Sequence, residues 1–207
     1  MIIDKGTLTR TDKSTADYEI THGRNIKYAF ECDRLWGQSN LKLWQAIANM
    51  DLDESALDAI LEELPLEDDH WRWVNKSNHF ASNDFEWFYL HAAGMPQGAC
   101  VIYHPKPSVL STGNIFYVEY LASAPWNRSC SLREREFYAV GSTLLCCVLR
   151  YAINTLRLSP GFSLHSLPKA QGFYQKLKMV NISQHNKDSL LYFELPKDEA
   201  KKLICVA

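Results

Sequence analysis

Several patterns that would point directly to a function are missing from this chain. Its six cysteines and seven histidines form no Cys-x-x-Cys or His-x-x-x-His pair, so no metal site is expected. No Gly-x-Ser-x-Gly turn is present, which argues against a hydrolase with a serine nucleophile. No internal repeat and no low-complexity linker divides the chain. The function must therefore be sought in less direct patterns.

Long apolar runs and long runs of one charge are also missing. The longest apolar stretch, around Leu144 to Leu149, is too short to span a bilayer, and the N-terminus lacks a signal-peptide pattern. The formal net charge is −2, with both signs mixed along the chain. This balance argues against a protein that binds nucleic acid by neutralising phosphates. We expect a cytoplasmic protein with neither a membrane nor a nucleic acid as partner.

Apolar and aromatic side chains, in contrast, are plentiful. Of the 207 residues, 46% are hydrophobic and 12% are aromatic, enough for a sizeable core in one domain over 1–207. Residues 1–17 are polar and unpatterned, so we expect them to be poorly ordered. The cysteines lack the spacing of a disulfide framework, and buried, reduced thiols are expected.

The spacing of apolar residues predicts the elements of the first half. Partial alternation over 25–32 favours a first strand. Helices are expected over 39–50 and 54–64, and Asp53 is the expected cap of the second. Residues 66–84 are first acidic and then rich in tryptophan, and no element is assigned to them.

The second half is predicted to contain a strand meander and then alternating helices and strands. The expected elements are strands at 85–92, 98–103 and 115–123, a helix at 140–156, a strand at 162–167, a helix at 169–178 and a strand at 190–195. The alternation at the end implies crossover connections and some parallel pairing. We therefore predict a mixed α/β fold, with a mostly antiparallel central sheet and flanking helices.

Three segments carry a resemblance to a known superfamily. They are Tyr-Leu-Ala-Ser-Ala-Pro-Trp-Asn-Arg at 120–128, Val-Gly-Ser-Thr-Leu-Leu at 140–145, and Ala-Gln-Gly-Phe-Tyr-Gln-Lys-Leu at 170–177. The last is similar to the Ala-x-x-Phe-Tyr-x-Lys-Leu-Gly-Phe pattern of the GNAT superfamily, which comprises acyl-CoA-dependent N-acyltransferases. The chain resembles this family in element order over about 85–195. The resemblance implies a cofactor-binding core at 85–207, with an N-terminal strand and acceptor-side helices at 18–84.

The resemblance also implies which residues would meet acetyl-CoA, the expected acyl donor. In the family, the strand matching 115–123 splays from its parallel neighbour, and the pantetheine arm bonds to its backbone. The pyrophosphate rests on amides that lead into the next helix, where glycine permits a close approach. The residues expected to bind the donor are Leu121, Ala122, Ser123, Arg128, Val140, Gly141, Ser142 and Thr143.

Acyl transfer to an amine also needs a base and a proton donor. Tyr174 matches the family's proton donor, and its alternative role is a ring packed under the sheet. Glu119 is the candidate base, on the strand face shared with Tyr117 and Leu121, and its alternative is an ordinary strand carboxylate. His165 is either a further base or a hydrogen-bonded structural histidine.

The phosphate loop departs from the family pattern, which is usually Gln/Arg-x-x-Gly-x-Gly/Ala. Here Glu136 places an acid at the first position, and Ala139 lacks the conformational freedom of glycine. Arg133 or Arg135 can supply positive charge instead. The expected function is acetyl or other acyl transfer to an amine acceptor by direct attack in a ternary complex. The alternative is a catalytically inactive GNAT-fold binding or regulatory module.

The sequence does not specify the acceptor. The aromatic residues Trp71, Trp73, Trp87, Phe88 and Tyr89 either line an acceptor pocket or form a core beneath the N-terminal helices. The acidic residues within 62–69 either attract a cationic acceptor or form a solvated loop. Many relatives pair, so a homodimer is one expected assembly.

Overall fold

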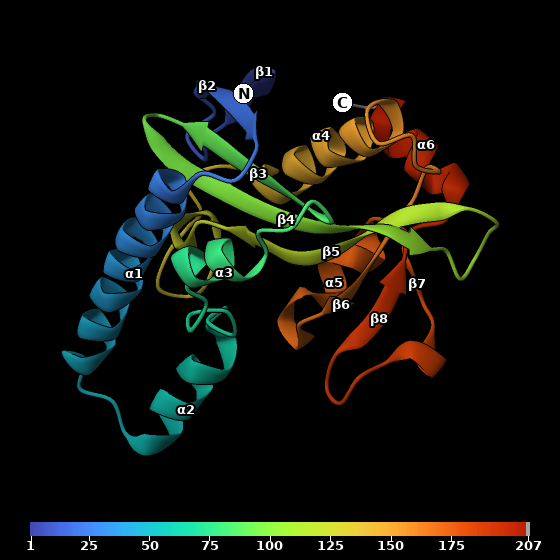
Figure 1. Ribbon diagram of the computed structural model, residues 1–207. Coiled ribbons are helices and arrows are strands. Elements are labelled where there is room, and N and C mark those ends of the chain that lie inside the picture. Colours follow the sequence, from blue (N-terminus) through green and yellow to red (C-terminus); the bar gives the residue numbers. More distant parts are fainter. Residues whose placement is uncertain (206–207) are drawn as a thin grey trace.

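One sheet of eight strands runs through the molecule, in the order β1-β2-β3-β4-β5-β6-β8-β7 (Figure 1). The computed structural model describes residues 1–205. The strands are β1 Ile2–Thr9, β2 Thr15–His22, β3 Phe85–Ala92, β4 Met95–Pro107, β5 Asn114–Ser123, β6 Phe162–Ser166, β7 Val180–Asn181 and β8 Leu191–Glu194. All neighbours pair antiparallel except β5 and β6, which are parallel. The predicted mixed α/β fold is thereby confirmed.

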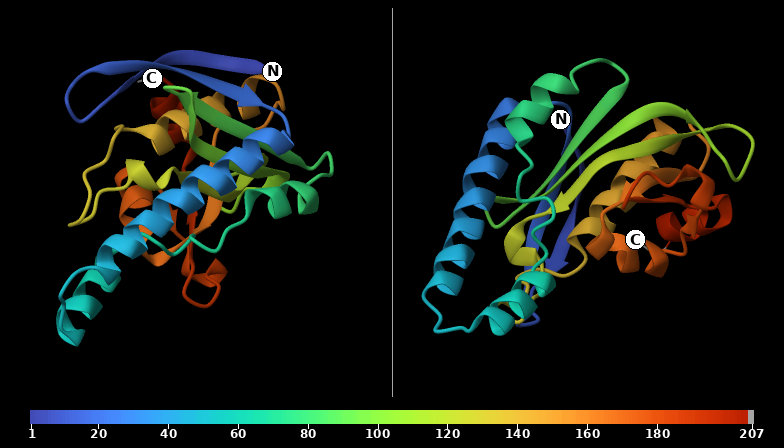
Figure 2. Two further views of the ribbon diagram at one scale, coloured as in Figure 1. Left: turned by 90° about the vertical axis from the view of Figure 1, so that its left-hand side faces the viewer. Right: turned by 90° about the horizontal axis from the view of Figure 1, so that it is seen from below.

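Helices cover both faces of this sheet. They are α1 Ile26–Ala48, α2 Glu54–Glu63, α3 Trp73–His79, α4 Val140–Asn154, α5 Gln171–Lys176 and α6 Lys197–Cys205. α4, α5 and α6 pack on one face and α1 and α3 on the other, while α2 and the end of α1 project beyond the sheet (Figure 2). No helix within residues 1–205 combines the length and the apolar character needed to cross a membrane.

Each face of the sheet has its own apolar core. The core on the α4 face includes Phe88, Phe116 and Leu144. The opposite core joins Trp36 of α1, Trp73 of α3 and the β3 residues Trp87 and Tyr89. Most of the predicted aromatic cluster is therefore core beneath the N-terminal helices. Two members differ: Phe88 faces the α4 side, and Trp71 is only partly buried.

The N-terminal segment corrects one expectation, because residues 1–17 form β1 and the start of β2 rather than a poorly ordered tail. Leu8 and Ile20 are buried against the α4-side core and hold the hairpin on the sheet. The turn between the strands is fixed by Asp12, whose Oδ1 accepts from the backbone N–H of Ser14 at 2.8 Å and from its hydroxyl at 2.6 Å. A strand at the edge of a sheet needs few apolar residues, so the alternation of apolar and polar residues over 1–17 is weak.

A second correction concerns 25–50, where a strand and a short helix were expected. The structure has one long helix, α1. Asn25 caps it, since its side chain accepts from the backbone N–H groups of Lys27 and Tyr28 at 3.0 and 3.4 Å. Ala29, Cys32 and Trp36 follow at helical spacing and face the core. The apparent alternation over 25–32 is therefore the beginning of a helical stripe.

Other elements agree with the prediction, with shifted ends. Asp53 caps α2 by accepting from the backbone N–H of Ala56 at 2.8 Å. β3 occupies the expected residues 85–92. β4 continues to Pro107 instead of ending near Tyr103, because the pairing with β5 shifts register there and the prolines are accommodated at the irregularity. α3 occupies part of the segment left without an element.

Candidate functional site

The candidate site begins where the two parallel strands separate. β5 and β6 pair only at Phe116–Phe162, Tyr117–Ser163 and Val118–Leu164. On the β4 side, Val118 and Tyr120 pair with consecutive residues, which leaves Glu119 without a partner at a β-bulge. From there to Ser123, no strand within the described chain pairs with the free edge of β5. A stretch of β5 backbone is thus available to a ligand.

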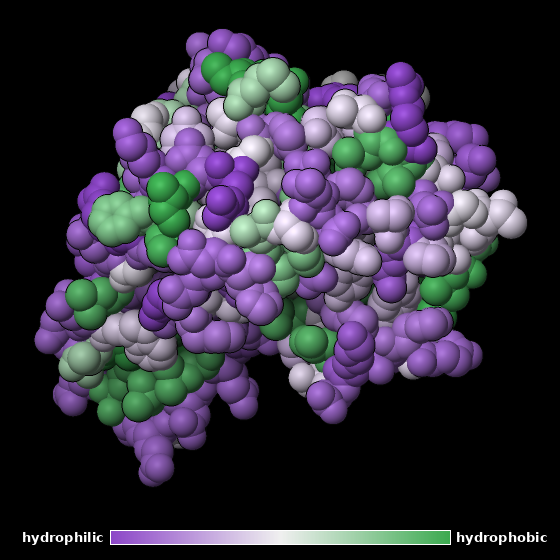
Figure 3. Space-filling view, viewed as in Figure 1, coloured by the Kyte–Doolittle hydropathy of each residue, from purple (hydrophilic) through white to green (hydrophobic). Residues whose placement is uncertain are grey.

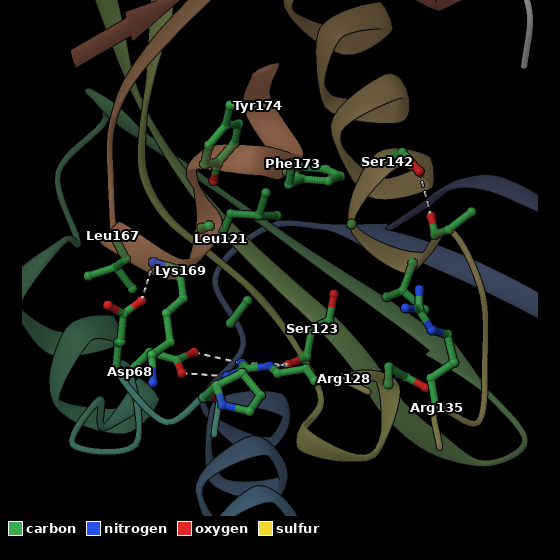
Figure 4. A pocket seen from close by; sticks show the side chains of 18 of the residues that line it. Asp68, Leu121, Ser123, Arg128, Arg135, Ser142, Leu167, Lys169, Phe173 and Tyr174 are labelled. Atoms are coloured by element: carbon green, nitrogen blue, oxygen red, sulfur yellow. Dashed lines mark hydrogen bonds and ion pairs between the residues drawn. The ribbon is translucent and has the colours of Figure 1, made fainter. Parts of the chain in front are cut away.

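A cavity of about 350 Å³ opens at this separation (Figure 4). Its size falls within the range typical of small-molecule sites. The walls come from the end of β5, the start of α4, the connection between β6 and α5, and the loop after α2. The lining residues are Pro65, Glu67, Asp68, Leu121, Ala122, Ser123, Asn127, Arg128, Arg135, Phe137, Ala139, Val140, Gly141, Ser142, Leu167, Lys169, Ala170, Phe173 and Tyr174.

The N-terminus of α4 points free backbone donors toward this cavity. The first hydrogen bond of the helix runs from the N–H of Thr143 to the carbonyl of Ala139 at 2.8 Å. The N–H groups of Val140, Gly141 and Ser142 precede it and have no partner among the described residues. Such an array, at the positive end of the helix dipole, favours a phosphate. Thr143 does not line the cavity.

Gly141 keeps the wall of the cavity open at this point. A Cβ added there would lie 3.6 Å from both Phe173 Cζ and Ser123 Oγ, two residues of the opposite cavity wall. A side chain at this position would therefore project into the cavity. The φ of Gly141 is not positive, so the glycine provides room at the cavity wall and is not needed for an unusual backbone angle.

The two unusual residues of the phosphate loop behave differently from each other. Glu136 is not a cavity residue, and its carboxylate lies 3.7 Å from Arg10 Nε on the outer hairpin side. The acid therefore does not oppose an anion at the α4 N-terminus. Ala139 adopts a φ of 60°, the left-handed conformation that glycine adopts at lower cost.

Arg135 supplies positive charge at the cavity, whereas Arg133 does not. Arg135 lines the cavity, and its Nε donates to the Ser129 hydroxyl at 2.9 Å (Figure 4). Arg133 points elsewhere and donates to the Ser39 hydroxyl of α1 at 3.2 Å. Of the two arginines that the sequence offered, the structure places only Arg135 beside the α4 N-terminus.

Residues 64–69, here called the strap, lie across the end of the cavity. On one side Arg128 holds them: its Nη1 and Nη2 lie 2.5 and 2.6 Å from the two carboxylate oxygens of Asp68. On the other side Lys169 donates from Nζ to the carbonyl of Leu64 at 2.7 Å and from its backbone N–H to Glu67 at 3.0 Å. The strap is thereby tied to both sides of the strand separation (Figure 4).

These contacts define the position of Arg128. Besides Asp68, its guanidinium donates from Nε and Nη2 to the carbonyl of Ser123 at 3.0 and 2.7 Å. The side chain lines the cavity, but its planar fork is already engaged by the protein. Its neighbour Asn127 is likewise internal, donating to Gln97 Oε1 at 2.9 Å and accepting from the Phe137 N–H at 3.1 Å.

Tyr174 lies in the cavity wall opposite β5. Its side chain is buried, and Figure 4 shows the hydroxyl directed into the cavity toward Leu121. No hydrogen bond to this hydroxyl occurs among the described residues. Burial raises the pKa of Tyr174 well above its ordinary value, so the phenol stays protonated at neutral pH. It is therefore a proton donor without a protein acceptor.

Comparison with known proteins identifies the fold. No family model matches the chain, and no curated protein matches it in sequence. Two solved structures cover most of it. The apo form of FdhC, a nucleotide-linked sugar GNAT, is 14% identical, with 89% of each chain covered and a TM-score of 0.54. A putative acetyltransferase from Exiguobacterium sp. 255-15 is 13% identical, with 90% of this chain and 97% of that chain covered and a TM-score of 0.50. The chain has the GNAT fold.

Within this GNAT fold, the candidate base lies apart from the cavity lining. Glu119 sits at the β5 bulge and is partly buried, but it is not among the cavity residues. Burial raises the pKa of its carboxyl group, while the positive charges of Lys187, Lys106 and Lys76 oppose that shift. The structure therefore brings Tyr174 and the residues expected to bind the donor, except Thr143, to one cavity and leaves Glu119 outside its lining.

Both ring nitrogens of His165 form hydrogen bonds within the protein. Its Nε2 lies 2.8 Å from the carbonyl of His185, which can only accept, so Nε2 carries the proton. Nδ1 then accepts from the Tyr117 hydroxyl at 2.6 Å. Burial lowers the pKa of His165, which favours this neutral form. Both ring nitrogens are thus occupied, which favours the structural alternative over a base.

Sequence reasoning missed the residues that come from the strap and from Lys169. Glu67 and Asp68 were read as part of an acidic stretch, yet both line the cavity, and Asp68 pairs with Arg128. Lys169 directly precedes the Ala170–Leu177 segment that carried the resemblance, so its position at the same edge of the sheet was a usable signal. Nothing in the local sequence indicated that the strap would cross the cavity.

Proposed function

We propose that this protein is an acyl-CoA-dependent N-acyltransferase, which moves an acetyl or other acyl group to an amine by direct attack in a ternary complex. The observation that carries this proposal is the cavity itself. It connects three free backbone N–H groups at the α4 N-terminus with the hydroxyl of Tyr174, along the unpaired edge of β5. The GNAT fold supports the same conclusion.

The residues present fit an acyl-CoA donor. Free N–H groups at 140–142 suit its pyrophosphate, with Thr143 closing the helix turn behind them, and Arg135 adds a nearby cation. The β5 backbone at 121–123 suits the amide-bearing pantetheine arm. Arg128 acts through the Ser123 carbonyl and the strap, which it fixes at the cavity edge. The donor supplies an acyl group activated as a thioester.

The protein's own groups then handle protons. Tyr174 donates its hydroxyl proton to the departing sulfur. Glu119 accepts the proton of the attacking amine, directly or through a water, and its raised pKa brings it nearer to neutral pH. Backbone N–H groups of β5 near Tyr120 and Leu121 stabilise the charge that develops on the carbonyl oxygen.

Isothermal titration with acetyl-CoA, with adenosine as the control ligand, tests the donor site. Gly141→Asp should abolish or strongly weaken binding, since it places a carboxylate among the free amides. Gly141→Asn has nearly the same size without the charge and should lose less. If both variants fold and bind acetyl-CoA as well as the unaltered protein does, the phosphate is not bound at the α4 N-terminus.

The alternative of an inactive GNAT-fold module loses one of its two supports. It rested on Glu136 and Ala139, and Glu136 pairs with Arg10 away from the cavity. Binding of acetyl-CoA without CoA release across a panel of primary amines would restore that alternative. CoA release that requires an amine would support the transferase.

A further inference from the structure

The chain that leads into α4 is held by the N-terminal hairpin. Residues 136–138, here called the lead segment, run antiparallel to the chain that follows β1 and form a bridge with it. The backbone N–H of Thr11 donates to the carbonyl of Glu136 at 3.1 Å. The N–H of Tyr138 donates to the carbonyl of Thr9 at 3.0 Å. The hairpin thus adds a short ladder to the segment that precedes the α4 N-terminus.

The lead segment is also held from its other side, by the turn after β5. The N–H of Glu136 donates to the carbonyl of Trp126 at 2.8 Å, and the N–H of Phe137 donates to Asn127 Oδ1 at 3.1 Å. The segment therefore lies between two partners, as the middle strand of a sheet does. It is followed by Tyr138 and Ala139 and then by the free N–H groups of α4. Its position therefore determines where those donors lie.

The side chain of Arg10 contacts the lead segment at two residues. Its guanidinium carbon lies 4.8 Å from the centroid of the Phe137 ring, within the range of a cation on an aromatic face. Its Nε lies 3.7 Å from the carboxylate of Glu136. Phe137 is 1% exposed and lines the cavity. Arg10 therefore contacts both a residue of the cavity wall and the acid beside it.

The ion pair of Arg10 and Glu136 is partly exposed, so it contributes little to the stability of the fold. Its effect on the charge near the cavity is larger. Glu136 directly follows Arg135, the cation that lines the cavity. Without Arg10, the carboxylate of Glu136 would compete with an anionic ligand for Arg135 and would repel that ligand.

We propose that the N-terminal hairpin is part of the donor site and that Arg10 is its positioning residue. This inference rests on the proposed function. Arg10 holds the lead segment through Phe137 and neutralises Glu136, so that Arg135 and the free N–H groups of α4 stay available to the donor's phosphates. Arg10 acts through these groups, because it does not line the cavity itself.

Isothermal titration of the full chain and its variants with acetyl-CoA tests this inference. Arg10→Gln should raise the Kd about fivefold, because the charge of Glu136 is then no longer neutralised. Arg10→Lys keeps the charge but loses the planar group, and it should raise the Kd by less than about twofold. Lys5→Gln is the matched control, since it removes a cation from the same hairpin, where Lys5 pairs with Glu19 at 2.7 Å. It should leave the Kd unchanged.

Removing the acid as well separates this role from a merely structural one. The double variant Arg10→Gln/Glu136→Gln should return the Kd to within about twofold of that of the unaltered protein. The difference between Arg10→Gln and the unaltered protein should also shrink as the salt concentration rises, because salt screens the exposed carboxylate. Glu136→Gln alone should bind acetyl-CoA at least as tightly as the unaltered protein. This single variant decides the question if Arg10→Gln does not fold, as judged by its melting temperature.

Three results would overturn the inference and leave the proposed function standing. They are an unchanged Kd in folded Arg10→Gln, an equal loss of binding in Lys5→Gln, and weaker binding in Glu136→Gln alone. A loss in Arg10→Gln that the double variant does not restore also overturns it, because Arg10 would then only support the fold. If the unaltered protein does not bind acetyl-CoA, the proposed function and the inference both fail.

Discussion

At the scale of single residues, the cavity depends on groups that the protein itself leaves unpaired. The hydroxyl of Tyr174 and the N–H groups of Val140, Gly141 and Ser142 have no partner among the described residues, although they face a partly buried space. The first N–H groups of any helix lack a partner within that helix, so a ligand in this cavity can accept from them and from the Tyr174 hydroxyl.

Tyr174→Phe should separate binding from chemistry. The ring still fills its buried place, so the Kd for acetyl-CoA should change by less than about threefold. The turnover rate should fall by about 100-fold or more, as expected when a proton donor is lost. Titration and a CoA-release assay measure the two effects. Tyr151→Phe, on α4 away from the cavity, is the matched control and should keep full turnover. Unchanged turnover in Tyr174→Phe would remove the tyrosine from the chemistry.

Ala139→Gly should stabilise the fold. Ala139 has a φ of 60°, where a Cβ costs about 1–2 kcal/mol, and glycine's extra unfolded-state entropy offsets about half of that. The expected gain is about 0.5–1 kcal/mol, or about 1–4 °C in melting temperature. Ala46→Gly, at an exposed position inside α1, should instead lose about 1 kcal/mol. A lower melting temperature for Ala139→Gly would mean that the left-handed turn is not strained.

At the scale of elements, the sequence predicts the helices and strands in which apolar residues recur with one period over many residues. It misses the elements in which this pattern is short. The helix at 140–154 and the strand at 85–92 have many apolar residues at one period. The hairpin of β1 and β2 places few apolar residues in the core. At the start of α1, apolar and polar residues alternate as they would in a strand, although the segment is helical. Local patterns cannot separate these cases, because the deciding contacts are with distant strands.

The same limit applies to the site. Gly141 and Tyr174 lie inside recognisable segments, and their placement at the cavity follows from the element order. The strap depends on pairs such as Asp68 with Arg128, which are far apart in the chain and meet only after folding. The β5 bulge likewise takes Glu119 out of the cavity lining. A prediction that assumes regular alternation along the strand does not include this change in side-chain direction.

Glu194→Gln should destabilise the connection between β4 and β5. The buried carboxylate of Glu194 accepts from the backbone N–H groups of Val109 and Leu110 at 3.0–3.1 Å and from the hydroxyls of Ser108 and Tyr192. An amide has only one accepting oxygen, so at least one buried donor loses its partner, at a cost of about 2 kcal/mol. The midpoint of thermal unfolding should fall by about 4–8 °C.

Tyr192→Phe removes a single hydrogen bond to Glu194 and should cost about 1 kcal/mol. Equal stability of Glu194→Gln and the unaltered protein would refute this assignment.

At the scale of the whole molecule, burial is distributed unevenly. The strands β3, β4 and β5 are covered on both faces, whereas α2 has no fully buried residue. Figure 3 shows apolar surface gathered over α2 and the end of α1, where Leu41, Trp44 and Met50 are exposed. The strands that carry the cavity are thus the best-packed part of the fold, and α2 is the least buried of its helices within residues 1–205.

Native-state hydrogen exchange should reproduce this gradient. Amides of β3 and β4 should exchange only through global unfolding, because their side chains form both cores. Amides of α2 should exchange by local opening, at least about 100-fold faster than those strands. If α2 is protected as strongly as β4, this part of the molecule is held by contacts that its burial does not reveal.

The tryptophans provide the α1 and α3 face of the sheet with an optical signal of its own. Trp73 lies 5.6 Å from Trp36, 6.1 Å from Trp71 and 6.4 Å from Trp87, measured between ring centroids. At such separations excitation energy passes readily between indoles. Trp71 also touches the ammonium group of Lys76. Light absorbed anywhere in the cluster can therefore be emitted or quenched beside β5, so the charge on one lysine becomes visible in the fluorescence of the unlabelled protein.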